Sequence, residues 1–354
     1  MKLYSVLAGG VLNVLRAEKA ALKRPHSPAG RDWRAASDAM SLAERLECGR
    51  FSAAFGRQHW PSALALAGLL AVAFFTGCAT AQTASTKNIV IIAGKPSHPA
   101  GMHEFRAGSL LLQKCLASTP GVSVTVYSNG WPNVPNAFDG ADAVVIYADG
   151  GGGNPAVQAD HKKTLGDLAG RGVGLGFMHY GVEVLATNGG AEFKEWIGGH
   201  YEHQFSVNPM WSPDYQKFPK HPVANGVQPF SNKDEWYFNI RWREGQSGLT
   251  PILTATPSDD VRQGPYVYPR GPYPHIVAAS GREETMMWTF DRPDGGRGFG
   301  FTGGHTHANW GNPNQRKVVL NALLWLAKAK VPANGVESTV SEDDLKQNLD
   351  PKKK

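Results

Sequence analysis

Histidines are the residues of this sequence best suited to chemistry. Ten histidines follow residue 78, and seven of them lie beside segments that read as strands or at the start of a predicted helix. Imidazole exchanges a proton near neutral pH and is the commonest metal ligand, so this pattern favours acid–base or metal chemistry at one edge of a sheet. The seven residues are His98, His103, His179, His200, His203, His305 and His307.

Two histidines at strand ends are the leading catalytic candidates. His179 stands at a strand-to-helix turn, where a side chain is presented at the top of a sheet. His305 follows two glycines that let a ligand approach the backbone, and an extended chain would place His307 on the same face. We expect His179 and His305 to act as acid and base, in an order that the sequence leaves open, and Tyr180 and His307 to contact the substrate.

Carboxylates and an aromatic ring complete the candidate site. Glu235 lies in an acidic and aromatic stretch, and Asp149 follows a predicted strand. Most tryptophans of an α/β domain belong to its core, but Trp310 lies close to the C-terminal histidine pair, where its ring could cover a sugar. We expect Glu235 to be catalytic, orienting the substrate or binding metal. The other expected substrate contacts are His98, Asp149, His200 and Trp310.

A divalent metal ion is one cofactor that this set could hold. A metal site needs three or more convergent nitrogen or oxygen ligands, and His179, Glu235 and His305 could supply them. The chain has no H-E-x-x-H signature, so a metal-free acid–base site stays open. The glycine run at 150–153 lacks both the G-x-G-x-x-G spacing and a Walker lysine. It reads as a loop that lets substrate approach the backbone.

The order of predicted elements indicates an α/β fold. Residues 87–94 form an apolar, β-branched run typical of a buried parallel strand, and helices and strands then alternate as far as residue 178. This pattern predicts a doubly wound, mostly parallel sheet with helices on both faces. Additional strands are predicted in the second half, at 200–207, 252–256, 275–279, 285–290 and 298–302, before a closing helix at 315–330.

The net charge of +6 would suggest a nucleic-acid partner, but the surplus lies in the N-terminal part of the chain. Residues 1–87 hold 11 basic and 5 acidic side chains, whereas the remaining residues hold 25 of each. A neutral folded part lacks the positive surface that phosphate backbones require. We therefore expect no nucleic-acid partner.

The N-terminal residues read as an extension that ends in an export signal. Arginines precede the uncharged run 63–75, which is too short to span a membrane but fits a signal peptide. Cys78 follows Gly77 after this run, as in a bacterial lipobox, while Ala79-Thr80-Ala81 offers an ordinary signal-peptidase site. We expect export to the periplasm or cell envelope, with lipid anchoring at Cys78. The expected parts are the extension and signal 1–78, a polar tether 79–87, a domain 88–330 and a charged, disordered tail 331–354.

Five motifs in a fixed order resemble the ThuA-like, or trehalose-utilisation, family. They are Gly176-Phe177-Met178-His179-Tyr180-Gly181, Ile197-Gly198-Gly199-His200-Tyr201-Glu202-His203, His221-Pro222-Val223-Ala224-Asn225-Gly226, Asp234-Glu235-Trp236-Tyr237 and Gly303-Gly304-His305. The resemblance covers residues 88–330 and implies a fold similar to class I glutamine amidotransferases, with a flavodoxin-like core. His179 stands where those enzymes carry a nucleophilic cysteine, so acyl transfer through a thioester is not expected. Met178-His179-Tyr180 also departs from the Leu-His-Ala of many members.

The resemblance implies a role in carbohydrate catabolism. Our leading interpretation is an exported lyase, hydrolase or isomerase that acts on a keto-sugar or glycoside. A sugar carbonyl would acidify a neighbouring C–H bond for a histidine or carboxylate base. Two alternatives stay open: a non-catalytic sugar-binding lipoprotein, and a metal-dependent hydrolase of another polar substrate. The expected partners are a small carbohydrate and, through the lipid anchor, the membrane.

Overall fold

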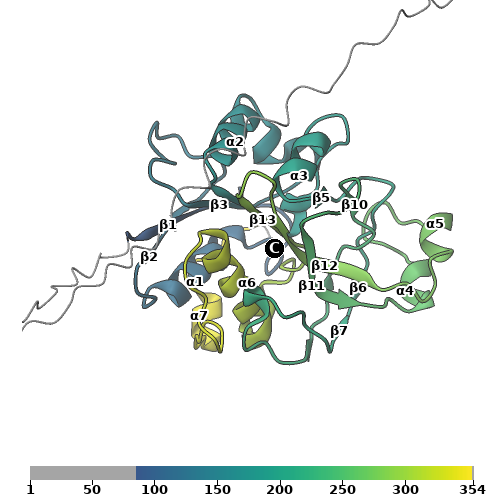
Figure 1. The fold of residues 1–354 in the computed structure, drawn as a ribbon. Helices are drawn as coiled ribbons and strands as arrows, with labels where there is room; N and C mark the ends of the chain where they lie inside the picture. The colour runs from purple at the N-terminus through teal and green to yellow at the C-terminus, as the bar shows by residue number, and fades with distance from the viewer. Residues whose placement is uncertain (1–84, 353–354) are drawn as a thin grey trace, which may run out of the picture. The chain divides into compact units, whose positions relative to one another are not determined.

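A seven-stranded mixed sheet organises the chain (Figure 1). The computed structural model describes residues 85–352, so the predicted export segment with Cys78 and the tether as far as residue 84 lie outside the described residues. Across the sheet the strand order is β11-β12-β13-β4-β3-β1-β2. These strands are β1 (Lys87–Ala93), β2 (Val122–Tyr127), β3 (Ala143–Tyr147), β4 (Gly174–Met178), β11 (Leu249–Ala255), β12 (Glu284–Asp291) and β13 (Arg297–Phe301).

The central strands are parallel and the added strands are antiparallel. β2, β1, β3, β4 and β13 all run in one direction, in the spatial order of a flavodoxin-like sheet. β12 runs against both of its neighbours, β13 and β11. The predicted flavodoxin-like, doubly wound sheet with additional strands in the second half is therefore confirmed. Its parallel strands bring their carboxyl ends to one edge of the sheet.

Helices cover both faces of the sheet, because alternate residues of a buried strand point to opposite sides. Ile89 and Ile91 of β1 lie in one core with α1 and α6, whereas Val90 and Ile92 lie in the other with α2 and α3. Figure 1 shows these two pairs on either side of the sheet. The helices are α1 (Phe105–Leu116), α2 (His161–Gly170), α3 (Gly190–Trp196), α4 (Asp259–Gln263), α5 (Pro274–Val277), α6 (Pro313–Leu326) and α7 (Glu342–Lys346).

The second half contains short ladders where longer strands are predicted. Within the predicted strand 200–207, His200 pairs as part of β5, and Tyr201 and Val207 form only isolated bridges. The predicted strand 275–279 is wrong, because Pro274, which has no N–H for a sheet, starts α5 there. The ladders β5–β10, β6–β9 and β7–β8 are antiparallel. Their strands are β5 (Gly199–His200), β6 (Met210–Trp211), β7 (Asp214–Tyr215), β8 (Phe230–Ser231), β9 (Asp234–Glu235) and β10 (Arg241–Trp242).

The charged C-terminal segment is ordered as far as Lys352, so the prediction of disorder is wrong for residues 331–352. Ser341 and Asp344 form a capping box that starts α7. Farther on, the Asp350 N–H donates to the Glu104 carboxylate at 2.9 Å, and the Lys352 ammonium lies 3.2 Å from the same carboxylate. The charges that indicate disorder in the sequence are used in specific pairs that hold this segment beside α1.

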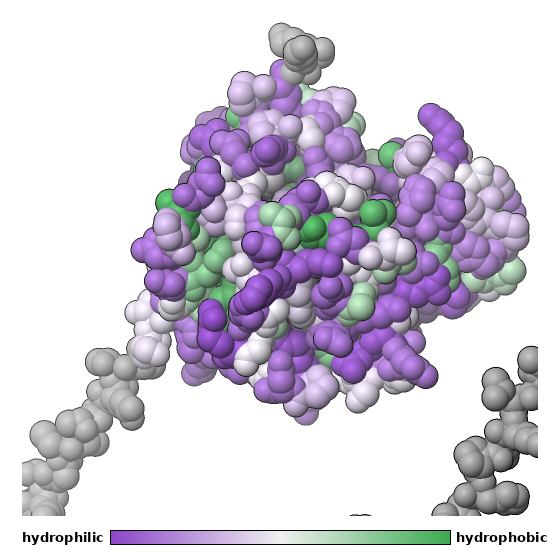
Figure 2. All heavy atoms as spheres, turned by 90° about the horizontal axis from the view of Figure 1, so that it is seen from above, coloured by the Kyte–Doolittle hydropathy of each residue, from purple (hydrophilic) through white to green (hydrophobic). Residues whose placement is uncertain are grey.

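The surface shown in Figure 2 is mainly hydrophilic, with hydrophobic residues in small separate groups. In the part of the chain that the structure describes, no helix has the length and apolar character needed to cross a membrane. Neither observation concerns the N-terminal residues. The largest apolar surfaces of the domain are instead turned inward, into the two cores beside the sheet.

Candidate functional site

Three histidines and one glutamate meet beyond the carboxyl ends of the central strands. His103 lies in the loop between β1 and α1, and His179 directly follows β4. His305 follows β13, and Glu235 ends β9. Four segments that are distant in the sequence therefore contribute one side chain each, and the predicted convergence of His179, Glu235 and His305 is found in the structure.

The contacts among these four side chains are short. His103 Nε2 lies 2.9 Å from His305 Nδ1 and 3.0 Å from His179 Nε2. Glu235 Oε2 lies 2.6 Å from His305 Nδ1 and 3.7 Å from His179 Nε2. All four are buried, and their ligand atoms lie within 4.8 Å of one another, close enough to hold a metal ion. We call these four residues the histidine–glutamate cluster.

The turn after β4 fixes the His179 ring. Its backbone has a φ of 53°, a left-handed conformation uncommon outside glycine, and begins the 3₁₀ helix η3 (His179–Val182). Its Nδ1 lies 2.9 Å from the Thr302 carbonyl oxygen, just beyond β13. Asn154 secures the other end of the turn by donating to the carbonyl oxygens of Gly181 and Glu183. The ring stands at the sheet edge, as the sequence predicts, but it is fully buried.

Asp149 supports the His103 ring from the loop after β3. Its Oδ1 lies 2.9 Å from His103 Nδ1 and accepts the Ser97 hydroxyl, also at 2.9 Å. The His98 ring stacks on the His103 ring, with centroids 3.6 Å apart. Burial raises the pKa of Asp149 above its usual value. Asp149 and His98, both predicted from the sequence, therefore lie beside the cluster.

Asp234 fixes the loop that carries His305. Its buried carboxylate accepts the backbone N–H groups of Gly304 at 2.8 Å and Thr306 at 2.9 Å. The same carboxylate accepts the N–H of Glu235 at 3.0 Å. One side chain thus sets the positions of Glu235 and His305 relative to each other, because it bonds to the backbone of both segments.

A cavity of about 120 Å³ opens onto the cluster. His103 and Glu235 line it, and Asn208 Nδ2 donates to Glu235 Oε1 at 2.7 Å. Its wall mixes hydroxyl, carboxyl, amide and imidazole groups, which can exchange hydrogen bonds with sugar hydroxyls. The other lining residues are His98, Tyr180, Glu183, His203, Tyr237, Val267 and Tyr268.

Burial sets the protonation states around this cavity. Burial, and then the charge of Glu235, raise the pKa of Glu183 to about 8, so its carboxyl holds a proton at neutral pH. Burial lowers the pKa of His103 to about 2 and that of His179 well below its usual value, so both rings are neutral. Burial also raises the pKa of Tyr180 to about 12. Strongly shifted groups that share a cavity are typical of functional sites.

Three residues predicted as substrate contacts, His200, His307 and Trp310, lie away from this cavity. The His200 ring packs against the start of α3. Neither of its nitrogens has a hydrogen-bond partner among the described residues, and its Nε2 lies 3.7 Å from Glu202 Oε2. His307 begins the 3₁₀ helix η5 (His307–Gly311) instead of extending the strand, so its Nε2 turns to the Leu345 carbonyl oxygen at 3.0 Å. Trp310 is fully buried in the core. Its ring is not available to a ligand.

Two main site residues receive no assigned role from the sequence, namely His103, which counts only among the histidines near predicted elements, and Glu183. The neighbouring Glu104 makes His103 read as part of a helix start. No sequence pattern indicates Glu183. It follows the short 3₁₀ turn η3, which shows neither the two-residue repeat of a strand nor the 3.6-residue repeat of a helix, and this turn brings the chain back to the cavity. Tyr237 has a usable signal, since alternation along an extended chain places it on the same face as Glu235.

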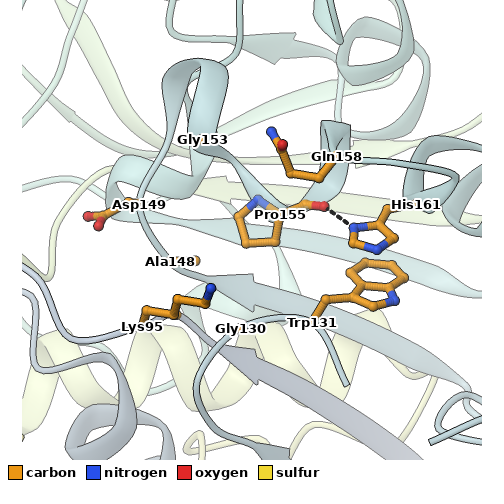
Figure 3. Close-up of a pocket in the computed structure, with 10 residues that line it drawn as sticks. Lys95, Gly130, Trp131, Ala148, Asp149, Gly153, Pro155, Gln158 and His161 are labelled. Atoms are coloured by element: carbon orange, nitrogen blue, oxygen red, sulfur yellow. Dashed lines mark hydrogen bonds between the residues drawn. The ribbon is translucent and has the colours of Figure 1, made fainter. Parts of the chain in front are cut away.

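A second cavity of about 460 Å³ lies at the carboxyl ends of β1 and β3 (Figure 3). The rings of Trp131 and His161 stack in its wall, with centroids 3.8 Å apart. His161 Nδ1 donates to the Pro155 carbonyl oxygen at 2.6 Å. Gly153 of the glycine run and Asp149 also line this cavity, although the Asp149 carboxylate points away from the stacked rings. Asp149 therefore stands between the two cavities.

Comparisons with known proteins identify the family of this chain and solved structures that resemble it. A ThuA-like protein from Bacteroides uniformis has a similar fold at 13% sequence identity, with 69% of this chain and 92% of that chain covered and a TM-score of 0.50. A ThuA-like protein from Parabacteroides merdae is 16% identical, with 74% and 99% covered and a TM-score of 0.46. No curated protein matches the chain. The family model described as trehalose utilisation matches residues 91–326, and the chain therefore belongs to the ThuA family.

Proposed function

We propose that the protein is an enzyme of carbohydrate metabolism that exchanges protons with a sugar bound in the cavity above the histidine–glutamate cluster. One observation carries the proposal: buried ionisable groups from separate segments converge on a cavity at the carboxyl edge of the sheet, where open α/β folds bind ligands. Membership of the trehalose-utilisation family supports the substrate class.

Glu183 is the group that we assign to proton transfer. Its neutral carboxyl can protonate a sugar oxygen, and its conjugate base can remove a proton from a carbon next to a carbonyl. His179 and His305, the acid and base expected from the sequence, do not line the cavity because their rings face one another inside the cluster. The chemistry that follows is that of a lyase or isomerase acting on a keto-sugar.

A sugar-binding protein without catalysis is the second candidate. Three tyrosines in the cavity wall favour it, since their hydroxyls could hold a sugar without any reaction. A binding role alone, however, does not require two buried carboxyl groups close enough for Glu235 to raise the pKa of Glu183. Such an arrangement costs folding free energy and is typical of active sites.

Turnover separates these two candidates. We expect the purified full chain to consume keto-disaccharides while leaving the parent disaccharides unchanged, as followed by NMR spectroscopy of the products. A binding protein would instead release heat in calorimetry with either sugar and form no product. Absence of both turnover and binding across this panel would contradict the proposal.

We also propose that the protein is exported and anchored to the membrane through a lipid on Cys78. The Gly77-Cys78 junction after the apolar run 63–75 supports this, as does the concentration of basic residues before it. Replacing Cys78 with Ser should release the protein from the membrane fraction or leave its signal uncleaved. Labelled fatty acid should enter the wild-type chain; a mature N-terminus at Gln82 without label would disprove anchoring and leave export standing.

A further inference from the structure

Two histidines of the cluster have partners that fix their ring protons. His179 Nδ1 faces the Thr302 carbonyl oxygen at 2.9 Å, and a carbonyl oxygen only accepts, so the proton lies on Nδ1. His103 Nδ1 faces the Asp149 carboxylate at 2.9 Å and carries its proton for the same reason. In the neutral form of each ring, Nε2 is left with a lone pair.

These two lone pairs lie 3.0 Å apart with no ring proton between them. His305 Nδ1 lies 2.9 Å from His103 Nε2 and 2.6 Å from Glu235 Oε2, so a proton on this nitrogen serves only those two contacts, and with its proton on Nε2 instead the ring adds a third nitrogen lone pair to the same small volume. A single added proton would join only one pair of these atoms along one line. A cation in the centre would accept electron pairs from the three nitrogens and the carboxylate oxygen, and the geometry favours this arrangement.

We propose that one divalent first-row transition metal ion binds the histidine–glutamate cluster, through His103 Nε2, His179 Nε2, His305 Nδ1 and Glu235 Oε2. Three imidazoles with one carboxylate suit zinc, iron or nickel, whereas calcium and magnesium prefer sites made of oxygen. The ion's role, polarising a sugar oxygen in the adjoining cavity, rests on the proposed function. The binding of the ion to the cluster does not depend on that function.

The spacing of the four atoms matches such an ion. Metal–ligand bonds of about 2.0–2.2 Å place neighbouring ligand atoms about 2.9 Å apart in an octahedral site and about 3.4 Å apart in a tetrahedral one. The observed separations along the four short edges run from 2.6 to 3.7 Å. The set is therefore already close to a bound arrangement.

The surroundings of the cluster complete the features of a metal site. Ligating histidines characteristically donate their other N–H to a carboxylate or carbonyl group, as His103 does to Asp149 and His179 does to Thr302. The Glu235 carboxylate is held by Asn208. Because His103 and Glu235 also line the cavity, a coordination position on that side would be open to substrate.

The test is metal content, measured without any reference to activity. The full chain, purified without a histidine tag and stripped with a chelator, is dialysed against Zn²⁺, and in parallel against Fe²⁺ and Ni²⁺. Elemental analysis should find about one zinc or iron ion per chain, and bound metal should raise the melting temperature. His103→Ala and Glu235→Gln should each lower the affinity by about tenfold or more. The exposed His275, changed to Ala, is the matched control and should bind as the wild type does.

The outcomes are distinguishable. Circular dichroism identifies a variant that fails to fold. If His103→Ala does not fold, the metal affinity of Glu235→Gln, whose side chain keeps nearly the same shape, decides whether the site exists. A stripped wild-type chain that takes up none of the three ions, or folded cluster variants that bind as tightly as the wild type, would overturn the metal site. Bound metal without turnover of any sugar would instead sustain the site and remove the proposed function. Unchanged turnover by metal-free protein would sustain the function and remove the ion's role.

Discussion

Replacing Glu183 with Gln should lower kcat by about 10²- to 10⁴-fold, the usual contribution of a positioned acid–base group. The amide has nearly the same shape, but it cannot release or accept the proton that the proposed reaction moves. Among the described residues no hydrogen bond to the Glu183 carboxyl contributes to its pKa, so the substitution should change the melting temperature little. Steady-state kinetics on the keto-disaccharide that the wild type consumes would measure the effect, with the melting temperature recorded in parallel.

Glu192 offers a matched control for this substitution. It lies on the surface of α3, paired with Lys162 at 3.1 Å, and Glu192→Gln should leave kcat unchanged. Both variants replace a carboxyl group with an amide, so a difference in kcat between them shows that the position of the carboxyl group matters. Full activity of Glu183→Gln would show that another group moves the proton.

Replacing Asp234 with Ala should remove metal binding and activity together and destabilise the fold by at least about 3 kcal/mol. The change leaves the buried N–H groups of Gly304, Thr306 and Glu235 without their acceptor, at a cost of about 1–3 kcal/mol each. It also frees the loop that holds His305. A fall in the melting temperature of roughly 10 °C should accompany the loss, as measured by calorimetry.

Asp234→Asn tests the positioning role of this side chain more finely. Its remaining carbonyl oxygen can still accept, so stability should be partly recovered, and the zinc affinity should lie between those of Asp234→Ala and the wild type. The exposed Asp214 serves as control, since Asp214→Ala breaks only a surface contact with Gln216. An Asp234→Ala chain that keeps its melting temperature and its metal would show that the loop is fixed by other contacts.

The first half of the fold is predictable because its strands are long enough to carry a pattern. A run such as Ile89 to Ile92, apolar at every position, must be buried on both faces, and glycine or polar residues mark its end. The ladders of the second half pair two residues each, which is too short for any period to show. Their positions depend on contacts with the sheet, and the chain's local sequence does not contain that information.

The site is predictable only where topology alone sets a residue's position. His179 and His305 follow parallel strands that are neighbours in the sheet, so their meeting follows from the predicted fold. His103 joins them from a loop whose path depends on a backbone bond to the His305 carbonyl, which no local pattern encodes. Trp310 and His307 are predicted to face a ligand but do not. The predictions assume an extended chain, whereas these residues lie in the 3₁₀ helix η5, whose tight turn points their side chains in other directions.

The contact between residues 350–352 and Glu104 couples the loop that bears His103 to a segment some 250 positions farther along the chain. Glu104 follows His103 directly, and its carboxylate receives the Asp350 N–H and the Lys352 ammonium. All strands of the sheet precede residue 302, so the loop that bears His103 gains its last anchors only when residues 350–352 dock. Truncations or purification handles near residue 354 would therefore act on this loop, although they lie some 250 positions away from it.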